Sequence, residues 1–425
     1  MSYTLPITFY QPFFMNNDRF IPFRKQDIIS MLAQELPKEH QQDSFLQFSQ
    51  LLSSVIHHDY HQLLDSLKCD YAPFDPNADT RSLTSYSLAQ RNEYRASFAN
   101  NFATVLNAAN FEKITEQDLQ DALTEESLFK VRLEVDFDDF EQVVFYRRGE
   151  SRKTETLTSF WGLRKQTINF THYDRVAVFI TFKDDEHFKQ KGKPPLGFEP
   201  SSTIVKLFQN VPKADLEMLF PNSEVRMRPI DKAIISGSAI VGGAVVLVTK
   251  LGASILLLAA LLAFWFGWRE ESVEMTQQHF ISFALGMGVF GGFIFKEWSK
   301  FKNRKIKFMK ALSDNLYFKN LDNNAGVFHT LIDAAEEEDF KEAIIAYAFL
   351  LKQPNGLSAI ELDKAVELWF QESYQCLLDF EISDALEKLQ SMQLVTVEGD
   401  RYFALSLKQA KVTLDNYWDN IYNFT

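Results

Sequence analysis

The sequence predicts an α+β membrane protein, and three observations support this fold class. Two long apolar runs flank a short acidic segment at residues 269–274. Residues 127–183 alternate between apolar and polar side chains, which is the period of half-buried strands. The regions before and after them carry apolar residues at helical spacing. In chain order we expect an N-terminal helical region, an antiparallel β-meander, a two-helix transmembrane hairpin and a C-terminal winged-helix-like module.

The expected domain boundaries follow these changes in pattern. They are 1–126 for the N-terminal helical region, 127–232 for an antiparallel β-sheet domain with a short helix, 233–296 for the transmembrane hairpin, 297–340 for a basic juxtamembrane helical segment and 341–425 for the winged-helix-like acidic module.

The hairpin is predicted from the lengths of the apolar runs. The first run extends from Ala233 to Trp268 and contains one charged residue, Lys250; the second extends from Phe280 to Phe295. A helix needs about 20 apolar residues to cross about 30 Å of hydrocarbon. We therefore expect two antiparallel spans at about residues 245–268 and 279–296.

Basic residues set the expected orientation and localisation. The lysines and arginines that follow the second span are Lys296, Lys300, Lys302, Arg304, Lys305, Lys307 and Lys310. Cytoplasmic flanks of membrane spans are rich in these residue types. We therefore expect an integral, multi-pass membrane protein with the lipid bilayer as a partner and both termini on the cytoplasmic side.

Small residues in the hairpin predict close helix packing. Gly288 and Gly292 have the small-xxx-small spacing, and Ser238 and Gly242 resemble it. One interpretation is that the two helices of one chain pack on each other through these residues. The alternative is a seam between two copies, which would make the protein a homo-oligomer.

The remaining elements are assigned from period, caps and turn signals. Turn signals at residues 148–151 and 173–174 divide the region 127–183 into about four antiparallel strands. One helix is expected to start near residues 24–27, and further helices to cover 43–67, 88–108 and 213–219. We also expect a strand at 203–208 and a break between two helices at 322–326.

The charge of the C-terminal module argues against nucleic acid as a partner. The expected order of two helices followed by a hairpin, with its turn at residues 398–401, resembles a winged helix. However, residues 341–425 contain 7 Lys/Arg and 13 Asp/Glu. The whole chain has a formal net charge of −13. Because phosphates would be repelled, we expect this module to bind a protein partner instead.

Two groups of polar residues are candidates for binding. Arg147 and Arg148, at the end of a predicted strand, could hold a phosphate or a lipid headgroup, or could be ordinary turn charges. Other basic residues that could converge on the same surface are Arg226, Arg228, Lys300, Lys302, Arg304 and Lys305. The second group is the turn Asp322, Asn323 and Asn324, for which the simpler interpretation is local Asx capping.

No motif in the sequence points to a reaction. There is no phosphate-binding glycine loop with a following Lys-Ser/Thr, no Gly-x-Ser-x-Gly and no Cys-x-x-Cys. The only cysteines, Cys69 and Cys376, fit a reducing compartment. We expect no cofactor and no metal site, and the sequence favours a protein that is not an enzyme.

Several long stretches resemble one known family. Val205 to Pro221, followed by Val225 to Arg228, is similar to the central signature of the transmembrane protein 143-like family. Asn315 to Phe328 is similar to its second block, to which Glu342-Ala343-Ile344-Ile345-Ala346-Tyr347 also belongs. The resemblance extends over about residues 130–420, including Tyr146-Arg147-Arg148-Gly149.

The resemblance implies an uncharacterised two-span membrane protein, mitochondrial if eukaryotic and in the cytoplasmic (inner) membrane if bacterial. It supplies no substrate or catalytic residue. Our first functional hypothesis is a membrane-anchored scaffold or partner-binding protein. The alternatives are a membrane-surface enzyme or binder of a phosphate-containing lipid or nucleotide, and an oligomeric pore or transporter.

Overall fold

The structure is a computed structural model, and it leaves several segments undescribed. The undescribed residues are 1–18, 37–38, 79, 81–82, 84, 116, 120–131, 160–163, 193–197, 227–236, 238–239, 247, 250–251, 269–275 and 423–425. The chain divides into two compact units. The larger unit contains residues 1–125, 137–216 and 319–425, and the smaller one contains residues 126–136 and 217–318.

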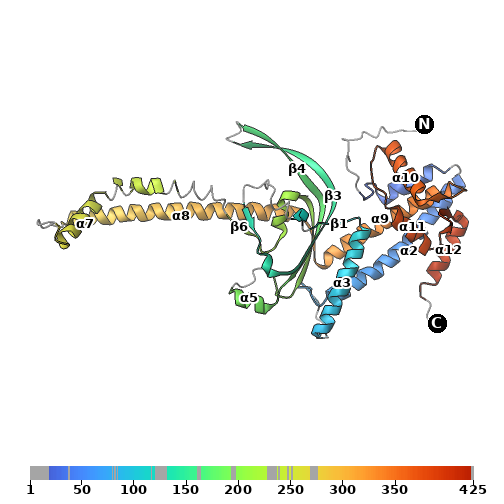
Figure 1. Ribbon diagram of the computed structural model, residues 1–425, viewed down its shortest axis with the longest axis horizontal. Coiled ribbons are helices and arrows are strands. Elements are labelled where there is room, and N and C mark those ends of the chain that lie inside the picture. The colour runs from blue at the N-terminus through green and yellow to red at the C-terminus, as the bar shows by residue number, and fades with distance from the viewer. Residues whose placement is uncertain are drawn as a thin grey trace. The chain divides into compact units, whose positions relative to one another are not determined.

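The larger unit combines helices with one main antiparallel sheet (Figure 1). Its helices are α1 (Lys25–Gln34), α2 (Glu39–Tyr71), α3 (Leu88–Ala108), α5 (Asp185–Lys191), α9 (Ala325–Leu351), α10 (Ala359–Tyr374), α11 (Ile382–Ser391) and α12 (Leu407–Asp419), with short 3-10 turns η1 (Phe137–Asp139) and η2 (Lys213–Leu219), the last crossing into the smaller unit. Its strands are β1 (Glu112–Lys113), β3 (Phe140–Ser159), β4 (Arg164–Phe182), β5 (Thr203–Pro212), β7 (Asn320–Asn323), β8 (Leu357–Ser358), β9 (Val395–Glu398) and β10 (Arg401–Ala404).

The main sheet has the order β1-β3-β4-β5-β7 with antiparallel neighbours. β3 and β4 pair far beyond the strands beside them and form a long two-stranded ribbon (Figure 1). The turns predicted at residues 148–151 and 173–174 do not occur, because Arg148 pairs with Arg175 and Glu150 with Tyr173 in one unbroken register. The glycine and the aspartate that suggested those turns, Gly149 and Asp174, lie opposite each other inside the ribbon.

The core of the larger unit forms around α9, most of whose residues are buried. α2, α3 and α11 all pack against this helix. An aromatic cluster joins it to the sheet: the ring of Phe98 lies 5.4 Å from Phe328 on α9 and 5.8 Å from Phe179 on β4. The N-terminal helices, the sheet and the C-terminal helices therefore share a single core.

The C-terminal part has the element order of a winged helix, from α9 through β8, α10 and α11 to the β9–β10 hairpin. Its small sheet has the order β8-β10-β9. A capping box starts α10, because the Ser358 side chain accepts from the Glu361 backbone while Glu361 accepts from Ser358 N–H. The helix that would read DNA, α11, instead packs on α9, and Lys388 Nζ lies 2.6 Å from Asp339 Oδ2.

The smaller unit contains β2 (Arg132–Glu134) paired with β6 (Glu224–Arg226), and the helices α7 (Gly252–Trp265) and α8 (Gln277–Lys319), of which only the last residue belongs to the larger unit. Among the residues that the structure describes, none of these helices is both long enough and apolar enough to cross a bilayer. The predicted transmembrane hairpin, with spans at 245–268 and 279–296, is therefore wrong. The prediction of an integral, multi-pass membrane protein, which depended on that hairpin, is wrong for the same reason.

The physical reason lies in how the apolar runs are divided among helices. α7 has 14 residues, which at about 1.5 Å per residue gives about 21 Å against the roughly 30 Å of a hydrocarbon core. The second apolar run forms only the first part of α8, whose 43 residues continue through the basic segment. An apolar run in the sequence therefore did not correspond to one apolar helix of spanning length.

Candidate functional site

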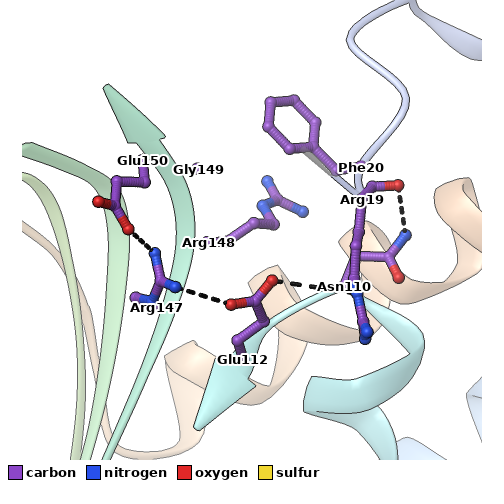
Figure 2. Close-up of a pocket in the computed structure, with 8 residues that line it drawn as sticks. All are labelled: Arg19, Phe20, Asn110, Glu112, Arg147, Arg148, Gly149 and Glu150. Carbon is purple, nitrogen blue, oxygen red and sulfur yellow. Dashed lines mark hydrogen bonds and ion pairs between the residues drawn. The ribbon is translucent and has the colours of Figure 1, made fainter. Parts of the chain in front are cut away.

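A small open pocket lies in the larger unit where β1 meets β3 (Figure 2). It offers about 250 Å³ of space, open solvent included. The residues that line it are Arg19, Phe20, Asn110, Glu112, Arg147, Arg148, Gly149 and Glu150. The pocket thus contains both of the arginines predicted to hold a phosphate.

Two local features of the backbone build this pocket. Asn110 has a φ of 57°, which lets the chain leave α3 and turn directly into β1. β1 then pairs with β3, placing Glu112 opposite Arg147. Gly149 has a φ of 69°, and a Cβ there would lie 2.5 Å from Asp174 Oδ2, so only glycine fits.

Arg147 is fully engaged with carboxylates. Its Nη2 lies 2.9 Å from Glu112 Oε2, and its Nη1 donates to Glu150 (Figure 2). The guanidinium also lies over the ring of Tyr173, 5.4 Å from its centroid. Its charge is therefore compensated inside the protein.

Arg148 is not compensated in this way. Its guanidinium contacts two phenyl rings, 5.3 Å from the centroid of Phe20 and 5.2 Å from that of Phe111. It donates one hydrogen bond, from Nη1 to the Ala109 carbonyl at 3.3 Å. No carboxylate among the described residues forms an ion pair with it.

Burial lowers the pKa of the Arg148 guanidinium, and the negative charge of Glu338 partly offsets this. A guanidinium gives up its proton only at very high pH, so the group stays charged at neutral pH. In Figure 2 its guanidinium points into the pocket, and no dashed line joins it to the residues drawn. Arg148 is therefore a cation in a partly desolvated position with donors left for a ligand.

The opposite side of the pocket comes from Arg19 and Phe20. They begin the segment 19–24, which precedes α1 and which we call the strap. Arg19 Nη1 lies 3.0 Å from Glu381 Oε1, and its carbonyl accepts from Asn110 Nδ2 at 3.4 Å. The same amide donates to Glu342 Oε1 at 2.9 Å. Asn110 therefore connects the strap to the core helix α9.

Glu342 lies directly behind this pocket wall and is 3 % exposed. Burial raises its pKa well above the ordinary value of 4.5, while the hydrogen bond from Asn110 acts in the opposite direction. The nearby Glu338 and Asp339 raise the pKa further. Folding therefore shifts the equilibrium of Glu342 towards its protonated form.

The polar turn predicted as a second candidate lies at the other end of the sheet. Across the sheet, the residues that pair in turn from Arg147 on β3 are Val176 on β4, Phe208 on β5 and Asn320 on β7. Asn320 is thus three strand spacings, or about 14 Å, from Arg147. The turn residues Asp322, Asn323 and Asn324 do not line the pocket around Arg148.

The turn residues are also used locally. Thr330 donates to the carboxylate of Asp322. Asn324 Oδ1 accepts from the Val205 backbone at 3.1 Å, and this asparagine is 5 % exposed with a φ of 49°. These contacts are those of a structural turn that joins β7 to α9.

The other predicted basic residues belong to the smaller unit. Arg226 pairs with Arg132 across β6 and β2, and Lys302 lies over the ring of Trp298 at 4.1 Å. Lys300 Nζ lies 2.5 Å from Glu297 Oε1. Arg304 and Lys305 lie within α8, whereas Arg228 falls outside the described residues. None of these residues lines the pocket described above.

The small residues of the apolar segment differ in their surroundings. A Cβ at Gly242 would lie 3.0 Å from Cζ of Phe293, so this glycine permits a close contact with α8. At Gly288 and Gly292 an added Cβ would meet nothing within 4 Å among the described residues. Ser238 lies outside the described part of the chain.

Sequence reasoning missed half of the pocket. Arg19, Phe20, Asn110 and Glu112 were not singled out, because only the fold brings them to β3. The sequence did contain one usable signal: Glu336 to Glu342 is a charged run within an otherwise apolar helix. Charges on a buried helix need partners, and the strap and Asn110 are among them.

One family model matches the chain, over residues 173–326, and it describes a protein of unknown function (DUF3754). No solved structure matched the chain. The match confirms an uncharacterised domain, whereas the narrower resemblance to transmembrane protein 143-like proteins stays a prediction. None of the eight residues that line the pocket falls within the matched region.

Proposed function

We propose that the protein binds a phosphate-containing ligand in the pocket around Arg148. The observation that carries this proposal is the state of that side chain. It is a cation in contact with two aromatic rings, with one hydrogen bond and no ion pair among the described residues.

Guanidinium chemistry supports an oxyanion as the ligand. The planar group presents several N–H donors in a fixed fork that matches two oxygens of a phosphate. Contacts with the rings of Phe20 and Phe111 restrict the position of the guanidinium before the ligand arrives. Such pre-organisation reduces the entropy that binding would otherwise cost.

The other pocket residues limit the kind of ligand. Glu112 and Glu150 repel an anion unless Arg147 continues to neutralise them. The pocket is small and open, so most of a bound ligand would extend into solvent. The lining offers no pairing of a nucleophile with a general base, so binding rather than catalysis is the activity that the site supports.

Isothermal titration calorimetry on the full chain tests the proposal. The probes are inorganic phosphate, glycerol 3-phosphate and adenosine monophosphate, of which the last two separate a glycerophosphoryl ligand from a nucleotide. We expect saturable binding that Arg148→Met weakens at least tenfold. The matched control is Arg152→Met, because Arg152 is an exposed arginine of the same strand outside the pocket.

Thermal melts establish whether Arg148→Met is folded, and Arg148→Lys provides a milder variant that keeps the charge but loses the planar fork. Equal affinity in wild type and Arg148→Met would refute the proposal. Absence of binding for all three probes would refute it as well.

A second candidate function is binding of a basic protein partner through the C-terminal module. Burial and neighbouring carboxylates raise the pKa values of Asp363 and Glu367 on α10 and of Asp384 on α11. Lys364, Lys388 and Arg19 offset part of this negative charge. Clustered carboxylates attract a positively charged surface. A lysine-rich peptide should bind the full chain in low salt and lose affinity when these three residues are neutralised together; unchanged affinity would exclude this candidate.

A further inference from the structure

The strap is held by two buried charges on α9. Lys341 Nζ donates to the carbonyls of Ile21 at 2.8 Å and Phe23 at 3.2 Å, and it lies 2.6 Å from Glu338 Oε1. Glu338 Oε2 in turn accepts from the Ile21 backbone N–H at 2.9 Å. We call Glu338 and Lys341 the clasp. It binds the donor and the acceptor of the same strap residue.

Apolar burial and one further hydrogen bond also hold the strap in position. Ile21 is 2 % exposed. The ring of Phe23 stacks on Phe370 at 5.8 Å, and the strap ends where Lys25 N–H donates to Glu337 at 3.0 Å. The extended backbone of Arg24, with φ −68° and ψ 148°, leads the chain into α1.

The clasped segment is also a wall of the anion pocket. Phe20 supplies one of the two rings that contact Arg148, and Arg19 lines the pocket beside it. The clasp itself does not line the pocket. If the strap left its position, Arg148 would keep Phe111 but lose Phe20, and the pocket would lose one side.

We propose that the strap is a closing wall of the anion site, so that strap docking and ligand binding stabilise each other. This inference rests on the proposed function. Lys341 is then a positioning residue, which acts on the ligand through Phe20 and Arg19. Because such coupling is reciprocal, the ligand must reduce opening of the strap by the same factor by which opening reduces affinity.

Hydrogen exchange of the full chain, read by mass spectrometry, measures strap opening directly. The amides of Ile21 and Lys25 are bonded to Glu338 and Glu337, so they exchange when the strap leaves. At a phosphate concentration of ten times Kd, opening should become about tenfold rarer. Exchange of these amides should slow by that factor, whereas the amides of α12 should not change.

Variants separate this coupling from a purely structural strap. In Arg148→Met, phosphate should leave the exchange of Ile21 unaltered. Lys341→Met should speed exchange without ligand and lower phosphate affinity at least fivefold, and Lys341→Arg should restore part of both effects. If Lys341→Met does not fold, the comparison of wild type with and without phosphate decides alone.

The outcomes distinguish the two proposals. Phosphate that binds in calorimetry without slowing exchange at Ile21 would overturn the role of the strap and leave the proposed function standing. If no phosphate binds at all, the proposed function fails and this inference fails with it. Slowed exchange in wild type that is lost in Arg148→Met supports both.

Discussion

Removal of the clasp lysine should destabilise the larger unit strongly. Lys341 is 3 % exposed, as is expected of a charge that depends on its partners. In Lys341→Met the carbonyls of Ile21 and Phe23 lose the ammonium that donates to them. The buried Glu338 carboxylate loses its ion pair and keeps the hydrogen bond from the Ile21 N–H. Breaking a buried pair from one side costs about 3–5 kcal/mol.

Urea denaturation of the full chain, followed by tryptophan fluorescence, measures this cost. With an m value of about 3 kcal/mol/M, the midpoint should fall by about 1–1.7 M. The double variant Lys341→Met/Glu338→Gln removes the stranded charge and keeps an acceptor for Ile21, so its cost should shrink to about 1–2 kcal/mol.

Lys189→Met is the matched control for this series. Lys189 pairs with Asp185 on the surface of α5, with side chains 72 % and 60 % exposed, and such pairs contribute less than about 0.5 kcal/mol. The reasoning is refuted if Lys341→Met costs no more than this control. It is also refuted if the double variant is as unstable as the single one.

Three further predictions concern single positions. Folding raises the pKa of Glu342, so the folded protein binds this proton more tightly than the unfolded chain does. The free energy of unfolding should therefore fall as the pH rises from the unfolded-state pKa of about 4.5 towards the folded-state pKa. Glu342→Gln should remove this pH dependence in denaturation curves from about pH 4.5 to 8. Gly149→Ala should lower the free energy of unfolding by more than about 2 kcal/mol, because strain at positive φ adds to a clash with Asp174. Gly192 also has a positive φ, but a Cβ there would meet nothing within 4 Å among the described residues. Gly192→Ala should therefore cost only about 1 kcal/mol in the same assay. Ser358→Ala removes the cap of α10 and should lower stability by about 1 kcal/mol, and an unchanged urea midpoint would contradict that role.

Local signals predicted much of the helical structure. The observed α3, Leu88–Ala108, has the expected bounds, and η2, Lys213–Leu219, begins directly after Pro212 as expected. The break between α8 and α9 was also predicted, at residues 322–326. In each case the determining contacts lie within a few residues along the chain.

The strands were harder, because their pairing decides what a turn residue does. Gly149 and Asp174 read as turn formers, yet each occupies a position inside a strand of the ribbon. Gly149 still uses its conformational freedom, with a φ of 69°, but it accommodates the Asp174 carboxylate rather than reversing the chain. Only the partner strand reveals this.

The candidate site was partly predictable for the same reason. Arg147 and Arg148 stand out in the sequence, but nothing local shows that the first is neutralised by Glu112 and Glu150 and that the second contacts two rings. The strap contacts α9 across more than 300 residues of sequence. The apolar runs gave the least reliable inference, because length in the sequence did not translate into helices of spanning length.

The most direct test of the central claim is an experimental structure of the full chain with tungstate, a heavy-atom analogue of phosphate. The account predicts anomalous density in the pocket, with tungstate oxygens within hydrogen-bonding distance of the Arg148 guanidinium and Phe20 still in place beside it. Tungstate bound elsewhere while this pocket stays empty, or an Arg148 turned away to pair with a carboxylate, would contradict it.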